Sequence, residues 1–306
     1  MAVPHTLLRG VRSLLGAALV GLLLAGCGRP APAASGKLQV VTTMSILEDM
    51  ISRVGGDQVE VRNVLPPGAG PESYQPRPGD AAAIAAAQIV FFNGTGLEDW
   101  IEDLFATAGG ADQPRISLSE GLPAIGANEE FSSGNPHFWL DPRYGMRYVE
   151  RIRDELSSVD PEHAETYHAN ANAYLQELRA LDARLLEQAN TIPPELRKLI
   201  TNHDAFPYFA QRYGFEVIGT ILPSADAGLS AGQVKHLVDL IKAENVRAIF
   251  AESQFRPEIT RQLAEDAGVE TVATLYTDTL GEQAPTYVAM LEYNMAQIVS
   301  ALSASS

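Results

Sequence analysis

The stretch PEHAETYHANANAYLQELRALDARLLEQAN, residues 161–190, contains no glycine and no proline after its first residue. Such a run favours one uninterrupted α-helix. We expect Asp160 as its N-cap and Pro161 in its first turn, with the helix ending before Pro193-Pro194. A helix of this length extends roughly 45 Å, which is longer than the helices of ordinary α/β domains. It could therefore run the length of a two-lobed molecule.

On both sides of this helix, short apolar runs alternate with helical patterns. The expected strands cover residues 38–42, 58–65, 88–92, 115–118, 196–201, 215–222, 246–251 and 270–275. The expected helices cover residues 46–54, 78–87, 97–108, 144–157, 205–213, 231–244, 257–267 and 283–302. This alternation predicts an α/β fold with parallel sheets covered by helices. We expect an N-terminal α/β lobe at residues 37–158, a connecting helix at 159–192 and a C-terminal α/β lobe at 193–306.

The first 26 residues have the features of a signal peptide rather than of a folded domain. Arg9 and Arg12 supply positive charge, and the apolar run at residues 13–26 is too short to span a bilayer comfortably. The run leads into Leu24-Ala25-Gly26-Cys27, which resembles the motif at which bacterial lipoproteins are cleaved and lipidated. A plain signal peptide with an incidental cysteine is the alternative.

Cys27 is the single cysteine of the chain, so no disulfide can form within it. We expect Cys27 to carry a lipid, and residues 27–36, rich in proline, alanine and glycine, to form an extended lipidated tether. The protein would then be a cell-envelope lipoprotein. Its place would be the periplasmic side or the outer face of the cytoplasmic membrane.

The charge of the chain limits its partners. It has 38 acidic and 22 basic residues and a formal net charge of −16. A nucleic-acid partner would require clustered lysine and arginine, so no nucleic acid is expected. An acidic chain is compatible with a cation as ligand.

Four side chains of metal-ligating type lie in loops: Glu72, His137, His203 and Asp278. In parallel α/β sheets, ligands bind beyond the carboxyl ends of the strands, so these loops are candidates for a common site. Two imidazoles and two carboxylates, one of each from either lobe, could close around one metal ion. Taken singly, each side chain also has an ordinary alternative, as a turn cap, a hydrogen-bonded loop residue or a solvated charge.

Two further carboxylates lie near these positions. Glu252 is expected directly after the strand at 246–251, from where it could hold the imidazole of His203 in place or merely cap the next turn. Asp204, next to His203, has the same two alternatives. The remaining histidines are expected in the signal peptide or on helix surfaces: His5, His163, His168 and His236.

Three segments carry a resemblance to a known family: PESYQPRP at residues 71–78, NPHFWLDP at 135–142 and NHDAF at 202–206. Together they resemble the zinc/manganese solute-binding lipoproteins of ABC importers, the helical backbone metal receptors or solute-binding protein family 9. The resemblance covers the chain from Lys37 to its C-terminus. It implies two α/β lobes, a rigid connecting helix, one metal site in the interlobe cleft, and a membrane permease with its ATPase as partners.

The resemblance also implies the ligand set. His137 and His203 match the second and third ligand positions, and Asp278 matches the fourth. Glu72 stands where the family usually has histidine, which moves the set toward harder ions such as Mn²⁺ or Fe²⁺. Because His203 is similar to the zinc-type third position, one divalent ion is expected, with Zn²⁺ favoured over Mn²⁺. A manganese or iron receptor of the same family is the alternative.

A zinc-dependent hydrolase and a surface adhesin are the alternatives to a transport receptor. A zinc-dependent hydrolase needs an open coordination position and a general base, and four protein ligands leave little room for water. The sequence contains no HExxH, GxSxG or phosphate-binding-loop motif. A surface adhesin is a further alternative, but no segment points to a partner surface. We therefore expect a monomeric binding protein and not an enzyme.

Overall fold

The computed structural model describes residues 36–110, 112–127, 132–222, 230–269 and 271–303. The expected signal peptide, Cys27 and nearly all of the tether lie outside these residues. The chain divides into two compact units, residues 1–37 and 38–306, and the fold below is that of the second unit.

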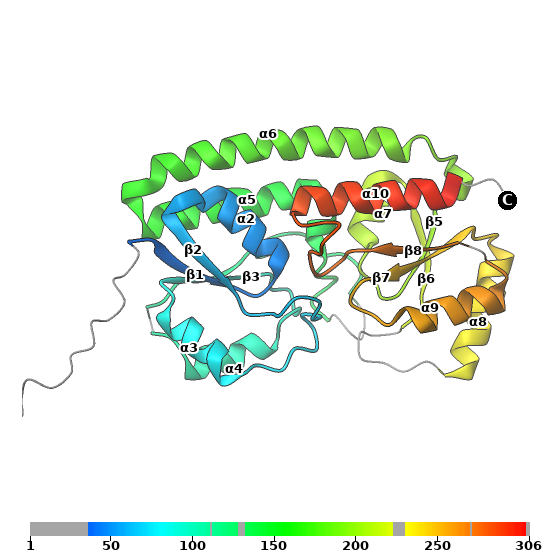
Figure 1. Ribbon diagram of the computed structural model, residues 1–306, viewed down its shortest axis with the longest axis horizontal. Helices are drawn as coiled ribbons and strands as arrows, with labels where there is room; N and C mark the ends of the chain where they lie inside the picture. The colour runs from blue at the N-terminus through cyan, green and yellow to red at the C-terminus, as the bar shows by residue number, and fades with distance from the viewer. Residues whose placement is uncertain (1–35, 111, 128–131, 223–229, 270, 304–306) are drawn as a thin grey trace, which may run out of the picture. The chain divides into compact units, whose positions relative to one another are not determined.

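The N-terminal lobe is built on a four-stranded parallel sheet with the order β2-β1-β3-β4 (Figure 1). Its strands are β1 (Leu38–Thr42), β2 (Val59–Asn63), β3 (Ile89–Phe92) and β4 (Arg115–Ser117). Helices α2 (Ser45–Gly55) and α5 (Pro142–Val159) cover one face. Helices α3 (Pro78–Ala86) and α4 (Trp100–Thr107) cover the other. Val40 packs toward the first pair and Val41 toward the second, because successive side chains of a strand point to opposite faces.

The C-terminal lobe has two parallel strand pairs, β5-β6 and β7-β8, with β5 beside β7. The strands are β5 (Lys198–Thr201), β6 (Glu216–Thr220), β7 (Ala248–Glu252) and β8 (Thr271–Leu275). Helices α7 (Pro207–Tyr213) and α10 (Tyr287–Ser303) lie on one face, and α8 (Ala231–Ala243) and α9 (Pro257–Ala267) on the other. The expected α/β class and lobe architecture are confirmed, with element ends shifted by a few residues.

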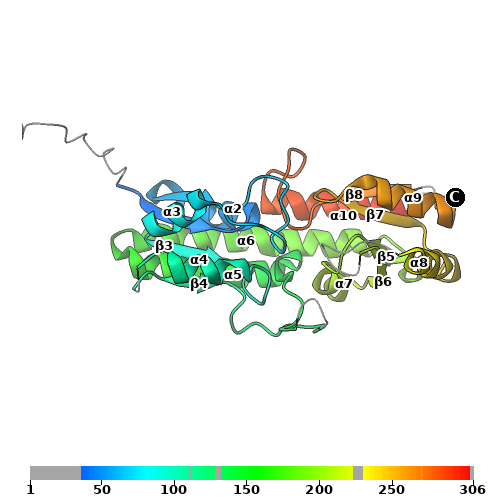
Figure 2. The same cartoon turned by 90° about the horizontal axis from the view of Figure 1, so that it is seen from below.

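The connecting helix α6 spans Ala164–Ala189, 26 residues, and runs beside both lobes (Figures 1 and 2). At the helical rise it is about 39 Å long. The helical segment begins at Pro161 as expected, but its first turn, Pro161–His163, is a 3-10 turn that leads directly into α6. The side chain of Asp160 does not cap a helix. Its Oδ2 instead accepts a hydrogen bond from the Tyr167 hydroxyl and lies 2.8 Å from His163 Nδ1.

One hydrophobic core extends through both lobes along α6. It contains side chains from α2 and α5 of the N-terminal lobe and from α7 and α10 of the C-terminal lobe. The Tyr287 hydroxyl, on α10, donates a hydrogen bond to the carbonyl of Trp139. At Gly145, on α5, a Cβ would lie only 2.3 Å from the Tyr287 hydroxyl oxygen, so this position has no room for a side chain. The lobes are therefore fused by packing and not only by the connecting helix.

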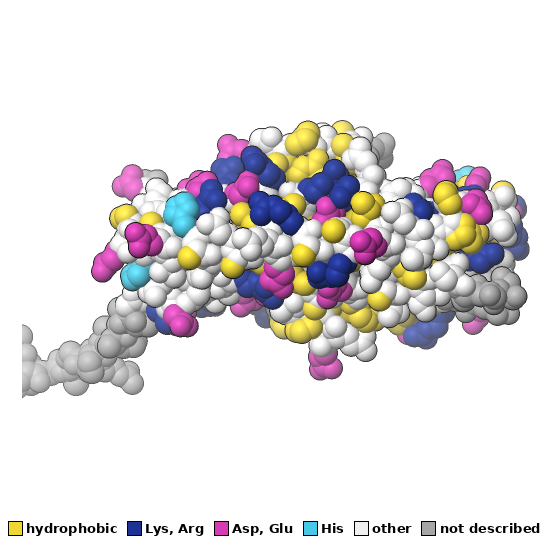
Figure 3. All heavy atoms as spheres, turned by 90° about the horizontal axis from the view of Figure 1, so that it is seen from above, with side chains coloured by type: hydrophobic (Ala, Val, Ile, Leu, Met, Phe, Trp, Pro, Cys, Tyr) yellow, Lys and Arg dark blue, Asp and Glu magenta, His cyan; other side chains and the backbone are white. Residues whose placement is uncertain are grey.

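The solvent face of α6 is held by ion pairs to three neighbouring helices. They join Arg53 to Glu177, Arg212 to Asp182, and Arg184 to Glu292. Exposed pairs of this kind contribute little individually, about 0.2–1 kcal/mol. Figure 3 shows basic and acidic side chains interspersed on the face seen from above. Among the described residues, no helix has both the length and the apolar character that crossing a membrane requires.

Candidate metal centre

The structure brings together the four side chains that the sequence singled out. Glu72 lies between β2 and α3, His137 just before the 3-10 turn Phe138–Leu140, His203 after β5 and Asp278 after β8. Each offers one ligand atom, and these atoms all lie within 4.8 Å of one another. The two imidazoles and the Asp278 carboxylate are buried, and 12% of the Glu72 side chain is exposed.

The separations between these atoms match the size of one coordinated ion. Nε2 of His137 lies 3.0 Å from Nε2 of His203. Oε1 of Glu72 is 3.5 Å and 3.8 Å from these two nitrogens, and the Asp278 oxygens are 3.6 Å and 3.4 Å from them. In a tetrahedral zinc site, neighbouring ligand atoms are about 3.3 Å apart. One small cation fits between the four groups after only slight adjustment.

Two carboxylate oxygens of the cluster also fit a cation. Glu72 Oε1 and Asp278 Oδ1 are buried, and neither has a hydrogen-bond partner among the described residues. A buried polar atom without a partner is costly, so it requires an explanation such as an ion. Both oxygens face the imidazole of His137, at 3.5 Å and 3.6 Å from its Nε2.

His203 is held from behind by a carboxylate. Its Nδ1 lies 2.6 Å from Glu252 Oε2. The other oxygen of Glu252 accepts hydrogen bonds from the backbone N–H groups of Asn202 and His203 at 2.8 Å and 3.0 Å. Glu252 is the last residue of β7, which lies beside β5, the strand that precedes His203. Its carboxylate contacts the His203 imidazole directly. A carboxylate behind a ligating imidazole fixes the ring and increases its basicity.

His137 is held by a neutral amide instead. Its Nδ1 lies 3.0 Å from Asn135 Oδ1, which also accepts the backbone N–H of His137 at 3.1 Å. If Nδ1 carries the proton, Nε2 presents a lone pair to the other three groups. Asn135 is anchored in turn by the Tyr208 hydroxyl, which donates to its carbonyl, and by the backbone carbonyl of Asp204. Asp204 therefore reaches the site through its backbone.

Burial and mutual charge set the protonation of the cluster. Burial lowers the pKa of His137. Burial alone would also lower the pKa of His203, but Glu252 and Asp278 outweigh it and raise this pKa well above its usual value. Burial raises the pKa of Asp278. For Glu72 the two imidazoles outweigh burial, and its pKa is lowered. Without metal, the raised pKa values of His203 and Asp278 favour the protonated forms of both groups.

Sequence reasoning missed several residues around the site. Gln254 and Thr277 connect Glu252 to Asp278, and their positions next to these carboxylates were the only signal. On the N-terminal side, Glu98 is buried and accepts hydrogen bonds from Thr43 Oγ1 and from two backbone N–H groups. Burial raises the pKa of Glu98 to about 7. Nothing in its sequence context distinguished it from a surface carboxylate.

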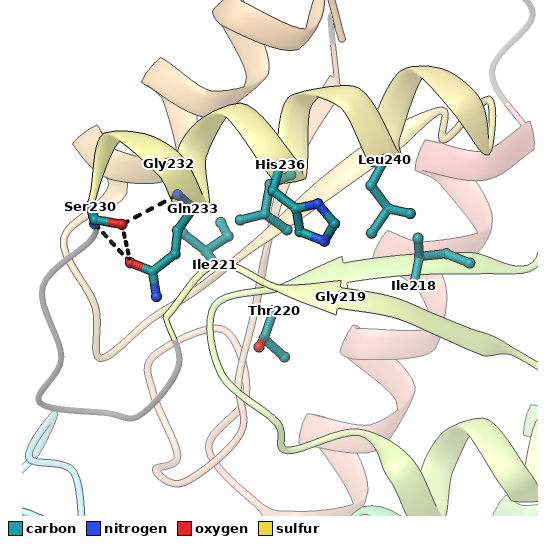
Figure 4. A pocket seen from close by; sticks show the side chains of 10 residues that line it. Ile218, Gly219, Thr220, Ile221, Ser230, Gly232, Gln233, His236 and Leu240 are labelled. Carbon is teal, nitrogen blue, oxygen red and sulfur yellow. Dashed lines mark hydrogen bonds between the residues drawn. The ribbon is translucent and has the colours of Figure 1, made fainter.

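The other histidines lie away from the cluster. His168 and His236 are exposed, and His163 is half-buried beside Asp160. His5 lies outside the described residues. His236 lines a groove of about 580 Å³ between β6 and α8, whose walls are mostly apolar (Figure 4). No second metal-ligating side chain accompanies it there among the residues that line the groove.

Comparison with known proteins adds the family. The family model described as "Zinc-uptake complex component A periplasmic" matches residues 40–301. The chain belongs to this family. The resemblance seen in the sequence is thereby confirmed.

Individual family relatives are named for different metals. The chain is 35% identical to the manganese-binding lipoprotein MntA of Halalkalibacterium halodurans, over 93% of this chain and 96% of the relative. It is also 35% identical to the iron-binding protein YfeA of Yersinia pestis, over 86% and 85% of the two chains. The periplasmic zinc-binding protein TroA of Treponema pallidum has a similar structure, with a TM-score of 0.81 and 29% identity over 87% of this chain and 99% of TroA.

Proposed function

We propose that this chain binds one divalent transition-metal ion through Glu72, His137, His203 and Asp278 and delivers it to an ABC-type importer. One observation carries the proposal: four ligand-type atoms converge within 4.8 Å, and two of them are buried carboxylate oxygens without partners. Relatives named as manganese ABC transporter substrate-binding lipoproteins, such as PsaA of Streptococcus pneumoniae, support the transport role. The partners are then a membrane permease and its ATPase.

Zinc is the metal that we favour. Two imidazole nitrogens and one free oxygen from each carboxylate make an N₂O₂ set, which suits four-coordinate Zn²⁺. The relatives carry manganese, iron and zinc in their names, so the preference depends on the ligand set of this chain. With four protein ligands, no position remains for the reactive water that a zinc hydrolase needs. A binding protein is therefore the better reading than an enzyme.

The proposal includes the organisation of the chain. Residues 1–26 form the signal peptide, and Cys27 carries the lipid at the start of the tether 27–36. The two lobes, 37–158 and 193–306, are joined by the connecting segment 159–192, and the protein acts as a monomer. The names of several relatives contain the word lipoprotein, which supports the anchor. Cys27→Ala should abolish lipidation in cells, which mass spectrometry of the N-terminal peptide measures; a diacyl-modified variant would reject the anchor.

The metal site is tested by elemental analysis of protein purified without added metal, followed by calorimetric titration with Zn²⁺ and Mn²⁺. We expect one ion per chain, tighter binding of Zn²⁺ and a large loss of affinity in His203→Ala. His236→Ala is the matched control, because His236 is exposed and lines the groove between β6 and α8, whose lining includes none of the four ligands. Binding that is unchanged in His203→Ala would reject the site.

A further inference from the structure

Gln254 lies on the loop after β7 and makes two short contacts beneath the site. Its Nε2 is 2.6 Å from Asp278 Oδ2 and 2.6 Å from Thr277 Oγ1. The same nitrogen is 3.3 Å from Glu252 Oε2. One side chain thus touches both the carboxylate that would bind the metal and the carboxylate that holds His203.

The chemistry of these neighbours fixes the orientation of the amide. When Asp278 binds a metal ion, its carboxylate is ionised and its oxygens only accept hydrogen bonds, so the NH₂ group of Gln254 then faces Asp278. Its two hydrogens are used by Asp278 Oδ2 and Thr277 Oγ1. Thr277 then donates its own hydrogen to Glu252 Oε2 at 2.9 Å. These hydrogen bonds run from Asp278 to the carboxylate behind His203, and Gln254 Oε1 is buried without a partner among the described residues.

This network treats the two oxygens of Asp278 differently. Oδ2 accepts the hydrogen bond from Gln254 and lies 3.4 Å from His203 Nε2, whereas Oδ1 lies 3.6 Å from His137 Nε2 and has no hydrogen-bond partner among the described residues. Binding through Oδ1 alone keeps the coordination number at four, which Zn²⁺ prefers. Binding through both oxygens raises the coordination number, which suits Mn²⁺ better.

We infer that Gln254 is a specificity-determining positioning residue: its hydrogen bond engages Asp278 Oδ2, leaves Oδ1 as the oxygen that binds the ion, and thereby favours Zn²⁺ over Mn²⁺. The inference rests on the proposed function. It concerns the ratio of two affinities, and a residue that merely supported the fold would not change this ratio. Removal of partners behind metal ligands typically costs about 10–100-fold in affinity. The loss of the hydrogen bond from Gln254 is therefore large enough to alter metal preference.

The test uses Gln254→Met, which keeps the length of the side chain and removes the donor, with Gln254→Leu as a second variant. Gln262→Met is the matched control, because Gln262 is exposed on α9 and, among the described residues, its side chain bonds only Asp266 of the same helix. Titration of each protein with Zn²⁺ and Mn²⁺ gives the ratio of affinities. We expect this ratio to fall by about tenfold in both Gln254 variants and to stay unchanged in the control.

A second readout compares the unaltered protein with Gln254→Met. Co²⁺ in place of the natural ion absorbs visible light strongly when four-coordinate and weakly when five- or six-coordinate. We expect strong absorption in the unaltered protein and weaker absorption in Gln254→Met. Weak absorption by the unaltered protein would overturn the inference. So would a ratio of Zn²⁺ to Mn²⁺ affinities and a Co²⁺ spectrum that both stay unchanged in Gln254→Met. Either result would leave the proposed metal binding intact. If the unaltered protein binds no metal, the proposed function itself fails.

Discussion

The two imidazoles at the centre of the cluster are held in different ways by the two lobes. His137, from the N-terminal lobe, is backed by the neutral amide of Asn135, whereas His203, from the C-terminal lobe, is backed by the Glu252 carboxylate. Both rings are fully buried, yet the pKa of His137 is lowered and that of His203 is raised. Burial sets the direction of the pKa shift at His137, whereas at His203 the carboxylates of Glu252 and Asp278 outweigh burial and reverse it.

This contrast gives the two histidines different tasks. His137 is ready to bind metal near neutral pH, because it presents an uncharged imidazole. His203 must first lose a proton, and Glu252 then makes it the more basic ligand. We therefore expect metal binding to release a proton from His203 rather than from His137.

The largest expected effect is the loss of either imidazole. A ligand that binds only the folded state adds about 4 kcal/mol to stability at a thousandfold excess over its Kd. Zn²⁺ should therefore raise the melting temperature clearly, and both His203→Ala and His137→Ala should largely abolish the rise. Thermal scans with and without Zn²⁺ measure it, with His168→Ala as the control. A full rise in either site variant would remove that histidine from the site.

The next effect concerns Glu72, the carboxylate of the N-terminal half. Glu72→Gln keeps the shape of the side chain and removes its charge, so it should weaken binding strongly. Glu72→His should restore binding and shift the preference further toward Zn²⁺, because imidazole is a softer ligand than carboxylate. Calorimetric titration of both variants with Zn²⁺ and Mn²⁺ decides the matter. If Glu72→Gln binds both metals as tightly as the unaltered protein, Glu72 is a solvated loop residue and not a metal ligand.

A smaller effect is expected from the groups behind the rings. Glu252→Gln should weaken Zn²⁺ binding by about 10–100-fold, and Asn135→Ala by less, because the amide adds no charge to its imidazole. Equal losses in the two variants would contradict the contrast between the lobes.

The stability of the metal-free Glu252→Gln variant has a predicted pH dependence. The raised pKa of His203 stabilises the folded state fully below the unfolded value, about 6.5, and this contribution disappears as the pH rises through the folded value. Glu252→Gln should therefore lower the melting temperature most below pH 6.5 and least in alkali. A deficit that grows with pH would have the wrong sign.

The smallest effect is expected in the shape of the molecule. Both lobes share one core along α6, so metal binding should order loops rather than close the lobes. Small-angle scattering should show no measurable compaction when Zn²⁺ is added. A large decrease in the radius of gyration would contradict the fused core.

The sequence was sufficient for the architecture and for the composition of the cluster. A helix as long as α6 and the βα alternation are local patterns, and side chains after parallel strands converge for a topological reason. The partners Asn135 and Gln254 could not be assigned, because amides are common in loops and their contacts depend on three-dimensional placement. The sequence placed Asp160 and Pro161 at the start of the helical segment, but it did not show that the first turn is 3-10 or that the Asp160 side chain bonds Tyr167.

X-ray absorption at the zinc edge of the zinc-loaded protein tests the central claim most directly, which is that four groups hold one ion. We predict four nitrogen or oxygen ligands at about 2.0–2.2 Å, with scattering from two imidazoles. In His203→Ala, the signal of one imidazole should be lost. A first shell of five or six ligands, or scattering from any other number of imidazoles, would contradict the account.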